Sequence, residues 1–174
     1  MLPTPTECHE SFIDIYPPRL METWYVIKHT DSLFIPSGFS DCMLMKFGRR
    51  MSFNSQIRMD IIYAHGSDAS ETQESQPMRG EVTVPGKEPF TIKIPSSAIF
   101  PVNLMVTHMD ESNDCLAFWS CANLGPSLSQ KGAWIMCKST DVDKEIVEDL
   151  TQKVSEVSNI DPEQFVWTNY EQCP

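Results

Sequence analysis

The stretch Asp114–Ser139 constrains the fold most, because it combines two extended runs with three of the six cysteines of the chain. The runs Asp114–Cys121 and Gly132–Lys138 are rich in apolar and aromatic residues, and turn-forming residues that include Gly125 separate them. This pattern predicts an antiparallel hairpin. Its cysteines then occupy fixed positions on two paired strands, so their partners restrict how the rest of the chain can fold.

Short runs of strand-forming residues, separated by turn formers, continue on the N-terminal side of this hairpin. The sequence predicts eight strands, at about 22–30, 41–47, 56–64, 78–84, 90–94, 99–109, 114–121 and 132–138. Because consecutive strands with tight turns pair antiparallel and eight of them leave two edges unless the sheet closes, we expect an all-β fold: an eight-stranded antiparallel up-and-down β-barrel. Such a barrel is wide enough to hold one small ligand. An immunoglobulin-like sandwich is the alternative fold.

After Lys138 the apolar residues recur at helical spacing. One stripe is expected to face the barrel from outside, and it comprises Ile146, Val147, Leu150, Val154 and Val157. Thr140 is the expected N-cap and Asn159 the expected stop. The acidic residues on the solvated face are Glu145, Glu148, Asp149 and Glu156. We expect a single domain, 1–174, with a proline-rich arm (1–20), the barrel (22–138), a C-terminal α-helix (141–158), and a C-terminal strand and tail (159–174).

Charge and motifs exclude several classes of function. The net charge is −11 and the 13 basic residues are scattered, so nucleic acid is not an expected partner. No apolar run reaches the roughly 20 residues of a membrane span. The cysteines and histidines lack zinc-site spacing, so no metal is expected. No Gly-x-Ser-x-Gly or His-Glu-x-x-His motif occurs, and we predict no catalytic residues and no enzyme activity. An even number of cysteines favours disulfides in a secreted protein.

Three stretches, METWYVIKHT, WIMCKS and FVWTNYEQCP, resemble those of the lipocalins. Trp24 matches the tryptophan of the family's first-strand motif Gly-x-Trp, although Glu22 stands at the glycine position. Lys138 stands where lipocalins have an arginine that packs over this tryptophan and closes the barrel floor. The resemblance therefore assigns Trp24 and Lys138 to the floor. Lysine keeps the charge of arginine but loses its planar stacking.

Within the lipocalins, the cysteine placement resembles that of crustacyanins, insect bilin-binding proteins and apolipoprotein D. In those proteins the N-terminal arm is tied to the strand before the last, and the second strand to the C-terminal tail. Carried over by position, and with the residual pair added, the resemblance implies the disulfides Cys8–Cys121, Cys42–Cys173 and Cys115–Cys137, although six cysteines allow fifteen connectivities.

Strand alternation agrees with the residual pair. Cys121 must face outward to reach an arm outside the barrel, and Cys115, six residues earlier, then shares its face. If Lys138 points inward to cover Trp24, its neighbour Cys137 faces outward. Both members of the pair Cys115–Cys137 are thus predicted to lie on the outside.

The same alternation predicts which residues face the interior, where core packing is the alternative to ligand contact for each of them. The candidates are mainly apolar, and thioethers adapt to irregular ligand shapes. The candidate ligand-binding residues are Lys28, Met43, Met45, Phe47, Ile57, Met59, Ile61, Tyr63, Val82, Leu104, Val106, His108, Leu116, Phe118 and Ser120. Those that can orient a polar end group are Lys28, Tyr63, His108 and Ser120.

The resemblance implies an extracellular carrier that holds a small hydrophobic molecule and needs no cofactor. A pigment is the leading ligand class, either a carotenoid such as astaxanthin or a bilin. The alternatives are a retinoid, fatty acid or steroid carrier, a lipocalin-type enzyme, and a ligand-free interaction module. A homo- or heterodimer is compatible with this reading, with Trp119 and Phe39 as exposed contact residues.

Overall fold

A computed structural model of the chain describes residues 22–31, 42–49, 56–65, 73–74, 78–83, 90–93, 102–110, 112, 114–125 and 128–171. Side chains are described within 22–31, 42–46, 105–110, 112, 114–121 and 130–171. The elements in chain order are β1 (Thr23–His29), β2 (Met43–Arg49), β3 (Gln56–His65), β4 (Gln73–Glu74), β5 (Met78–Thr83), β6 (Phe90–Lys93), β7 (Val102–Asp110), β8 (Cys115–Gly125), β9 (Leu128–Cys137), α1 (Lys144–Ser158), a 3-10 turn (Pro162–Gln164) and β10 (Val166–Trp167). The expected N-terminal arm, 1–20, lies outside the described residues.

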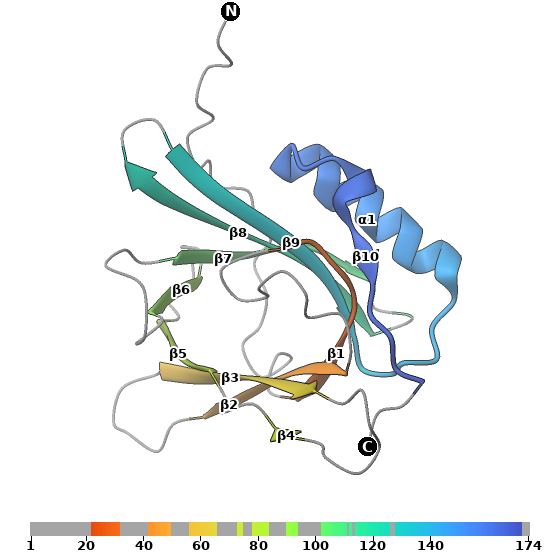
Figure 1. Cartoon of the computed structure of the whole chain (residues 1–174), viewed down its shortest axis with the longest axis horizontal. Helices are drawn as coiled ribbons and strands as arrows, with labels where there is room; N and C mark the ends of the chain where they lie inside the picture. Colours follow the sequence, from red (N-terminus) through yellow and green to blue (C-terminus); the bar gives the residue numbers. More distant parts are fainter. Residues whose placement is uncertain are drawn as a thin grey trace, which may run out of the picture.

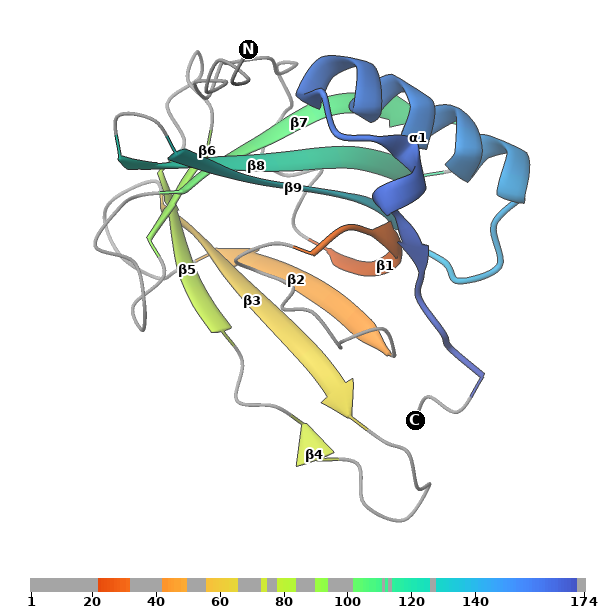
Figure 2. The same ribbon diagram turned by 45° about the horizontal axis from the view of Figure 1, so that its top comes forward.

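Strand pairing follows the order of the chain and then returns to its start. The strands β1, β2, β3, β5, β6, β7, β8 and β9 pair antiparallel in that order, and β9 also pairs with β1. Figures 1 and 2 show these strands around a common interior, with α1 against the outside beside β8 and β9. The predicted all-β fold, with antiparallel strands in sequence order and one helix outside, is confirmed. Two-residue β4, which pairs with β3, is not among the strands predicted from the sequence.

A cluster of buried apolar side chains, here called the outer core, lies between α1 and the outer face of the strands. Trp119 and Ile135 are completely buried there, against Val147 and Val154 of the helix. The predicted helical stripe is therefore confirmed, with Ile146 and Val157 packed at its edges. The prediction that Trp119 is exposed and available to a second subunit is wrong, because α1 covers it. Phe39, the other predicted contact residue, lies outside the described residues.

The helix begins and ends at residues with capping geometry. Asp143, not Thr140 as predicted, is the N-cap, and its side chain accepts a hydrogen bond from the Glu145 amide at 3.0 Å. The correction arises because α1 begins at Lys144, too far from Thr140 for its hydroxyl to reach the first free amides. At the other end Asn159 adopts the left-handed conformation with φ 59°, as expected for a C-terminal stop.

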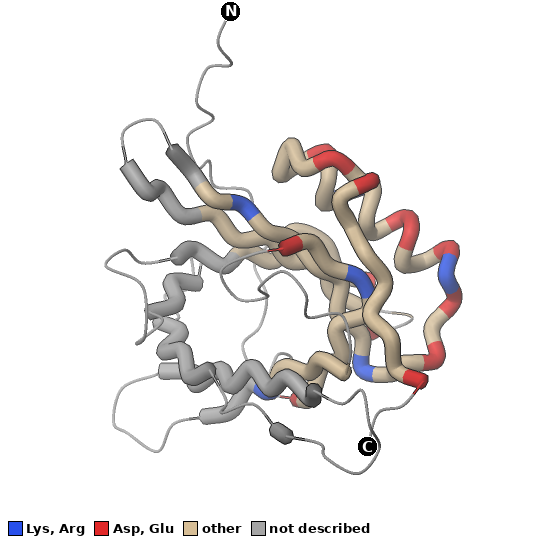
Figure 3. Tube along the Cα trace, in the orientation of Figure 1, with Lys and Arg blue, Asp and Glu red and all other residues tan. Residues whose placement is uncertain are grey.

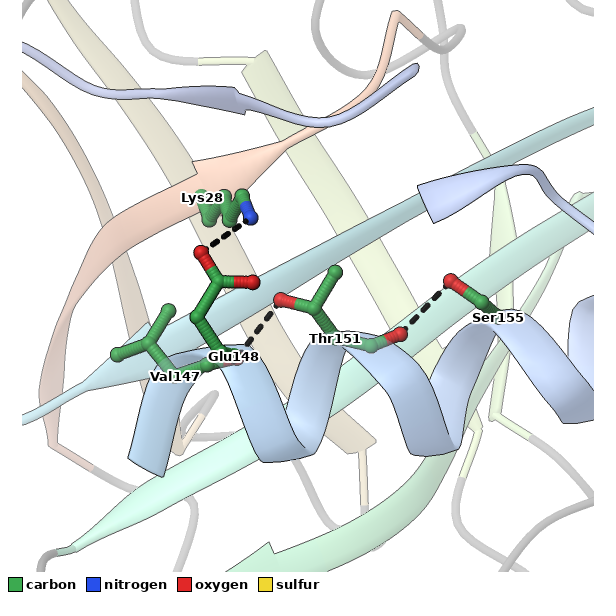
Figure 4. A network of polar contacts seen from close by, with 5 residues as sticks. All are labelled: Lys28, Val147, Glu148, Thr151 and Ser155. Carbon is green, nitrogen blue, oxygen red and sulfur yellow. Dashed lines mark hydrogen bonds and ion pairs between the residues drawn. The ribbon is translucent and has the colours of Figure 1, made fainter. Parts of the chain in front are cut away.

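The buried side of α1 carries hydroxyl groups that the apolar periodicity did not predict. Thr151, Ser155 and Ser158 are each buried, and each donates a 2.7 Å hydrogen bond to the carbonyl four residues earlier. Figure 4 shows the first two of these bonds. Because their hydroxyls are satisfied within the helix, these small residues can pack against the sheet without an unpaired polar atom. The predicted acidic residues of α1 are exposed, and Figure 3 shows acidic positions spread along the helix.

The C-terminal segment is bound where β1 separates from β2. β1 pairs with β2 through Thr23–Tyr25 and with β10 through Lys28 and His29. Between these two pairings, the Tyr170 hydroxyl lies 2.5 Å from the Val26 carbonyl oxygen and 2.6 Å from that of Met43. Burial raises the pKa of Tyr170 well above its usual value, so this hydroxyl stays a donor. The tail thereby supplies a donor at a point where the sheet ladder is interrupted.

The predicted disulfide Cys115–Cys137 is present and links directly opposed residues of β8 and β9. Both cysteines lie in the outer core beneath α1, on the face that strand alternation predicted. Cys42 and Cys121 are also disulfide-bonded. Their expected partners, Cys173 and Cys8, lie outside the described residues, so Cys8–Cys121 and Cys42–Cys173 stay predictions.

Candidate ligand-binding interior

A bulge in β1 reverses the facing of the residues from Lys28 onward. The pairing of β1 with β9 slips between Val26 and Lys28, because one extra residue is inserted in β1. Ile27 packs in the outer core, as alternation from Val26 expects, and the bulge places Lys28 on the outside as well. Lys28 Nζ is 3.1 Å from the Glu148 carboxylate of α1 (Figure 4). It is also 4.8 Å from the ring centroid of Trp167. The prediction that Lys28 faces the interior and orients a ligand is wrong.

A second bulge, in β7, has the same effect on His108. The register with β8 slips between Val106 and His108, which lies opposite Ala117 of the outer core. Its Nδ1 lies 3.0 Å from the Thr107 hydroxyl. Burial is the main cause that lowers the pKa of His108, and the Lys153 ammonium of α1 lowers it further. The prediction that His108 lines the interior is therefore also wrong.

The two bulges bring His29 and Met109 to interior positions that alternation alone did not predict. His29 lies opposite Trp134, and Met109 lies opposite Leu116. Directly opposed residues of antiparallel strands share a face, so both belong to the interior side. The sequence contained one indication of the bulges. Strict alternation placed Lys28 and His108 in an apolar interior, where a polar side chain carries a desolvation cost, and this cost favours a shift of register.

The described part of the interior is lined by aromatic and thioether side chains. Phe118 and Trp134 stack with ring centroids 5.9 Å apart and an interplanar angle of 3°. Met43 and Met45 are at most 1% exposed, and Val106 and Leu116 are equally buried. Ser120, which is buried as well, lies opposite Gly132, so two small residues adjoin the aromatic stack. These interior side chains are mainly apolar, and Ser120, His29 and the indole N–H of Trp134 supply their polar groups.

The remaining candidates lie on described strands, but their side chains lie outside the described residues. Their backbone register links them to the interior set, because Met43 pairs with Tyr63 and Met45 with Ile61. The other candidates in this group are Phe47, Ile57, Met59, Val82 and Leu104. For these residues ligand contact stays a prediction.

Trp24 and Lys138, the two residues that the resemblance assigns to the floor, lie together, and Glu22 contacts Lys138. Lys138 Nζ is 5.5 Å from the ring centroid of Trp24, which is buried. The same ammonium is 2.8 Å from the Glu22 carboxylate and 3.7 Å from that of Asp114. The hydrogen bond to Glu22 is the main cause that raises the pKa of Lys138. The two positions that depart from the lipocalin motif therefore form an ion pair with each other.

His29 is a buried histidine on the interior side with one ring nitrogen unpaired among the described residues. It is 1% exposed, its Nδ1 lies 3.4 Å from the Thr30 carbonyl oxygen, and its Nε2 has no hydrogen-bond partner among the described residues. Burial lowers the pKa of His29, against the opposing effects of the Thr30 carbonyl and the Asp31 charge. A neutral imidazole with one free nitrogen is therefore placed beside the aromatic stack.

Two further classes of site are not seen in the described part of the chain. Within those residues, no three His, Cys, Asp or Glu side chains gather closely enough to hold a metal ion. Nor does any helix there combine the length and hydropathy of a membrane span.

Solved structures provide the only matches among three comparisons. No family profile matches the sequence, and no curated protein does. The structural matches are lipocalins, and the chain has the lipocalin fold. Lobster apocrustacyanin A1 is similar with a TM-score of 0.64 and 17% identity, over 88% of this chain and 78% of that one. Insecticyanin from the tobacco hornworm Manduca sexta is similar with a TM-score of 0.67 and 16% identity, over 96% of this chain and 88% of that one. An odorant-binding protein is similar with a TM-score of 0.61 and 14% identity, over 89% and 94% of the two chains.

Proposed function

We propose that this chain is an extracellular carrier that holds a small hydrophobic molecule inside its barrel. The observation that carries the proposal is the interior side of β8 and β9, where Phe118 and Trp134 stack beside the small residues Ser120 and Gly132. Flat aromatic surface with adaptable thioethers suits an extended apolar ligand. Burial of that ligand contributes about 25 cal/mol per Å² of apolar surface before ordering costs.

A pigment, either a carotenoid or a bilin, is the proposed ligand class. Three observations favour it over a retinoid, fatty acid or steroid. The cysteine placement resembles that of crustacyanins and bilin-binding proteins, and the fold is similar to that of apocrustacyanin and insecticyanin. An extended conjugated molecule can also lie flat against the Phe118–Trp134 stack. The structure supports no second class of function more strongly, and no catalytic role is proposed.

An oxidising, extracellular location is part of the proposal. The disulfide Cys115–Cys137, together with disulfide-bonded Cys42 and Cys121, is the supporting observation. Such bonds persist outside the cell and are rare in the cytosol.

A fluorescence titration tests the carrier function. Retinol, astaxanthin, biliverdin and palmitate are titrated separately into the protein while tryptophan emission is recorded. We expect saturable quenching by at least one pigment, with an induced circular dichroism band. Ser120→Phe should weaken binding at least about tenfold, because the added ring would occupy the interior beside the stack, where the ligand is proposed to lie. Gln152→Phe, which adds the same ring at an exposed position of α1, is the matched control.

The carrier proposal fails if the folded wild-type protein is quenched by none of the four compounds. It also fails if Ser120→Phe and Gln152→Phe, both with native circular dichroism, bind the ligand equally well, because the ligand would then lie outside the barrel.

A further inference from the structure

We propose that His29 accepts a hydrogen bond from a hydroxyl or N–H group of the ligand and thereby fixes the ligand's polar end inside the barrel. The inference rests on the carrier function proposed above and names a residue and a ligand chemistry for it. It replaces Lys28 and His108, the two orienting residues whose side chains lie outside the barrel.

The bulge in β1 positions His29. Without the extra residue, strict alternation would turn His29 outward and Lys28 inward. With it, His29 lies opposite Trp134, whose ring stacks on Phe118. The imidazole is thus on the interior side, beside this stack, and His29, Phe118 and Trp134 are all outside the set of residues that forms the outer core beneath α1.

The hydrogen bonding of the His29 ring shows which kind of group the ligand would have to offer. A neutral imidazole has one N–H donor and one nitrogen acceptor. Nδ1 approaches the Thr30 carbonyl oxygen at 3.4 Å, and because a carbonyl only accepts, Nδ1 carries the hydrogen of this contact. Nε2 is then the acceptor, and it has no partner among the described residues. A buried acceptor without a donor is costly, so a donor group on the ligand would be stabilised at this position.

Electrostatics keeps the ring in this acceptor form. Burial is the largest influence on His29 and lowers its pKa, which favours the neutral imidazole at pH 7. The Asp31 carboxylate opposes this effect but is exposed at the end of β1. An imidazolium would donate from both nitrogens, and the neutral ring leaves Nε2 free to accept.

The acceptor character of Nε2 narrows the ligand class. A ring hydroxyl of a hydroxylated carotenoid, the pyrrole N–H of a bilin and the alcohol of retinol all offer the required donor. An aldehyde, an ester, a hydrocarbon carotene or an ionised fatty acid offers none. Among compounds of equal apolar surface, the chain should therefore prefer the one with a hydroxyl or N–H group.

Binding of all-trans-retinol and its methyl ether tests this preference, because the pair differs in the donor hydrogen and a single methyl group. The wild-type protein should bind retinol about tenfold more tightly than the ether, the effect of one satisfied hydrogen bond. His29→Phe should bring the two affinities within about twofold of each other, and His29→Gln, which keeps an acceptor oxygen, should restore part of the preference. His108→Phe, the same change on the outer face, should retain the wild-type preference.

The ring's tautomer is a second measurement that does not depend on ligand affinity. In ¹⁵N-labelled protein, long-range ¹H–¹⁵N spectra should show His29 neutral at pH 7 with its hydrogen on Nδ1. Addition of retinol should shift the Nε2 resonance and leave the His108 ring unchanged. Hydrogen on Nε2 in the free protein would contradict the inference.

The two proposals fail in distinguishable ways. Equal binding of retinol and its ether by the wild-type protein, or an alcohol preference that survives in His29→Phe, overturns the role of His29 but leaves the carrier function standing. Binding of neither compound, together with no response to the pigments above, overturns the carrier function itself.

Discussion

Glu22 and Lys138 show how two departures from a family motif can compensate each other. Lipocalins have glycine and arginine at these positions, and a lone change of either would leave the floor without its closing contact or with an extra carboxylate. In this chain the Lys138 ammonium lies 2.8 Å from Glu22 and 5.5 Å from the Trp24 ring centroid. The carboxylate holds the shorter, less directional lysine over the indole, a position that arginine reaches by planar stacking.

A double-mutant cycle measures this compensation. Because the two side chains are 34% and 50% exposed, the pair should contribute only about 0.5 kcal/mol to the free energy of unfolding. Lys138→Met should lose that coupling and the cation–π contact, for a total of about 1 kcal/mol. Urea denaturation of Lys138→Met, Glu22→Gln and the double variant gives the coupling energy.

Lys153 and Asp149 form an exposed i, i+4 ion pair on α1 and are the matched control, since their charges meet on the helix surface. Additive effects of Lys138→Met and Glu22→Gln would show that the two residues do not act together.

At the residue scale, alternation predicted most of the described interior set from the sequence, including Met43, Met45, Leu116 and Phe118. It failed at Lys28 and His108, each of which directly follows a bulge. A single inserted residue moves every later side chain to the other face, and neither bulge contains a glycine to signal it. The burial cost of a charged side chain was the clue that the sequence did contain.

At the scale of elements, the C-terminal segment 166–170 bonds to β1 at the point where β1 separates from β2, and we call this set of contacts the clamp. Thr168 donates to the Ile27 carbonyl at 2.9 Å, and Cys42 donates to the Asn169 carbonyl at 3.0 Å. The hydroxyl of Tyr170 contacts the carbonyls of Val26 and Met43. Its ring is edge-on to that of Tyr25, with the centroids 6.0 Å apart. These contacts let β1 pair with β2 at one end and with β10 at the other.

Removal of the Tyr170 hydroxyl should therefore weaken the clamp. Tyr170→Phe leaves two carbonyl oxygens without their shared donor and should lower the free energy of unfolding by about 1–3 kcal/mol. Denaturant titration measures the loss, and hydrogen exchange should show faster exchange of the Thr168 amide. Tyr25→Phe removes a hydroxyl from the neighbouring ring and is the control. Equal stability of wild type and Tyr170→Phe would refute the clamp.

Element types followed from periodicity, whereas their ends did not. The stripe that includes Val147, Leu150 and Val154 predicted α1 because tertiary packing needs an apolar face at helical spacing. Its start was misplaced because Thr140 and Asp143 are both good N-caps, and only the backbone decides between them. Two-residue β4 carries too few residues for any period to be recognised.

At the scale of the whole molecule, disulfides should join the terminal segments to the barrel. Peptide mapping without reduction should find Cys8–Cys121 and Cys42–Cys173 alongside Cys115–Cys137. The last bond, present between opposed strands, is the internal control for scrambling. A Cys8–Cys173 peptide would contradict the assignment, because it would join the two terminal segments to each other and leave neither tied to the barrel.

The central claim is that the barrel carries a small hydrophobic molecule. Native mass spectrometry of the protein from its natural source tests this most directly, because it reports bound mass and oligomeric state in one spectrum. We predict a mass in excess of the disulfide-bonded chain that matches one pigment molecule per barrel, bears a hydroxyl or N–H group, and is lost on extraction with organic solvent. The mass of the bare chain alone, unchanged after incubation with astaxanthin or biliverdin, would contradict the claim.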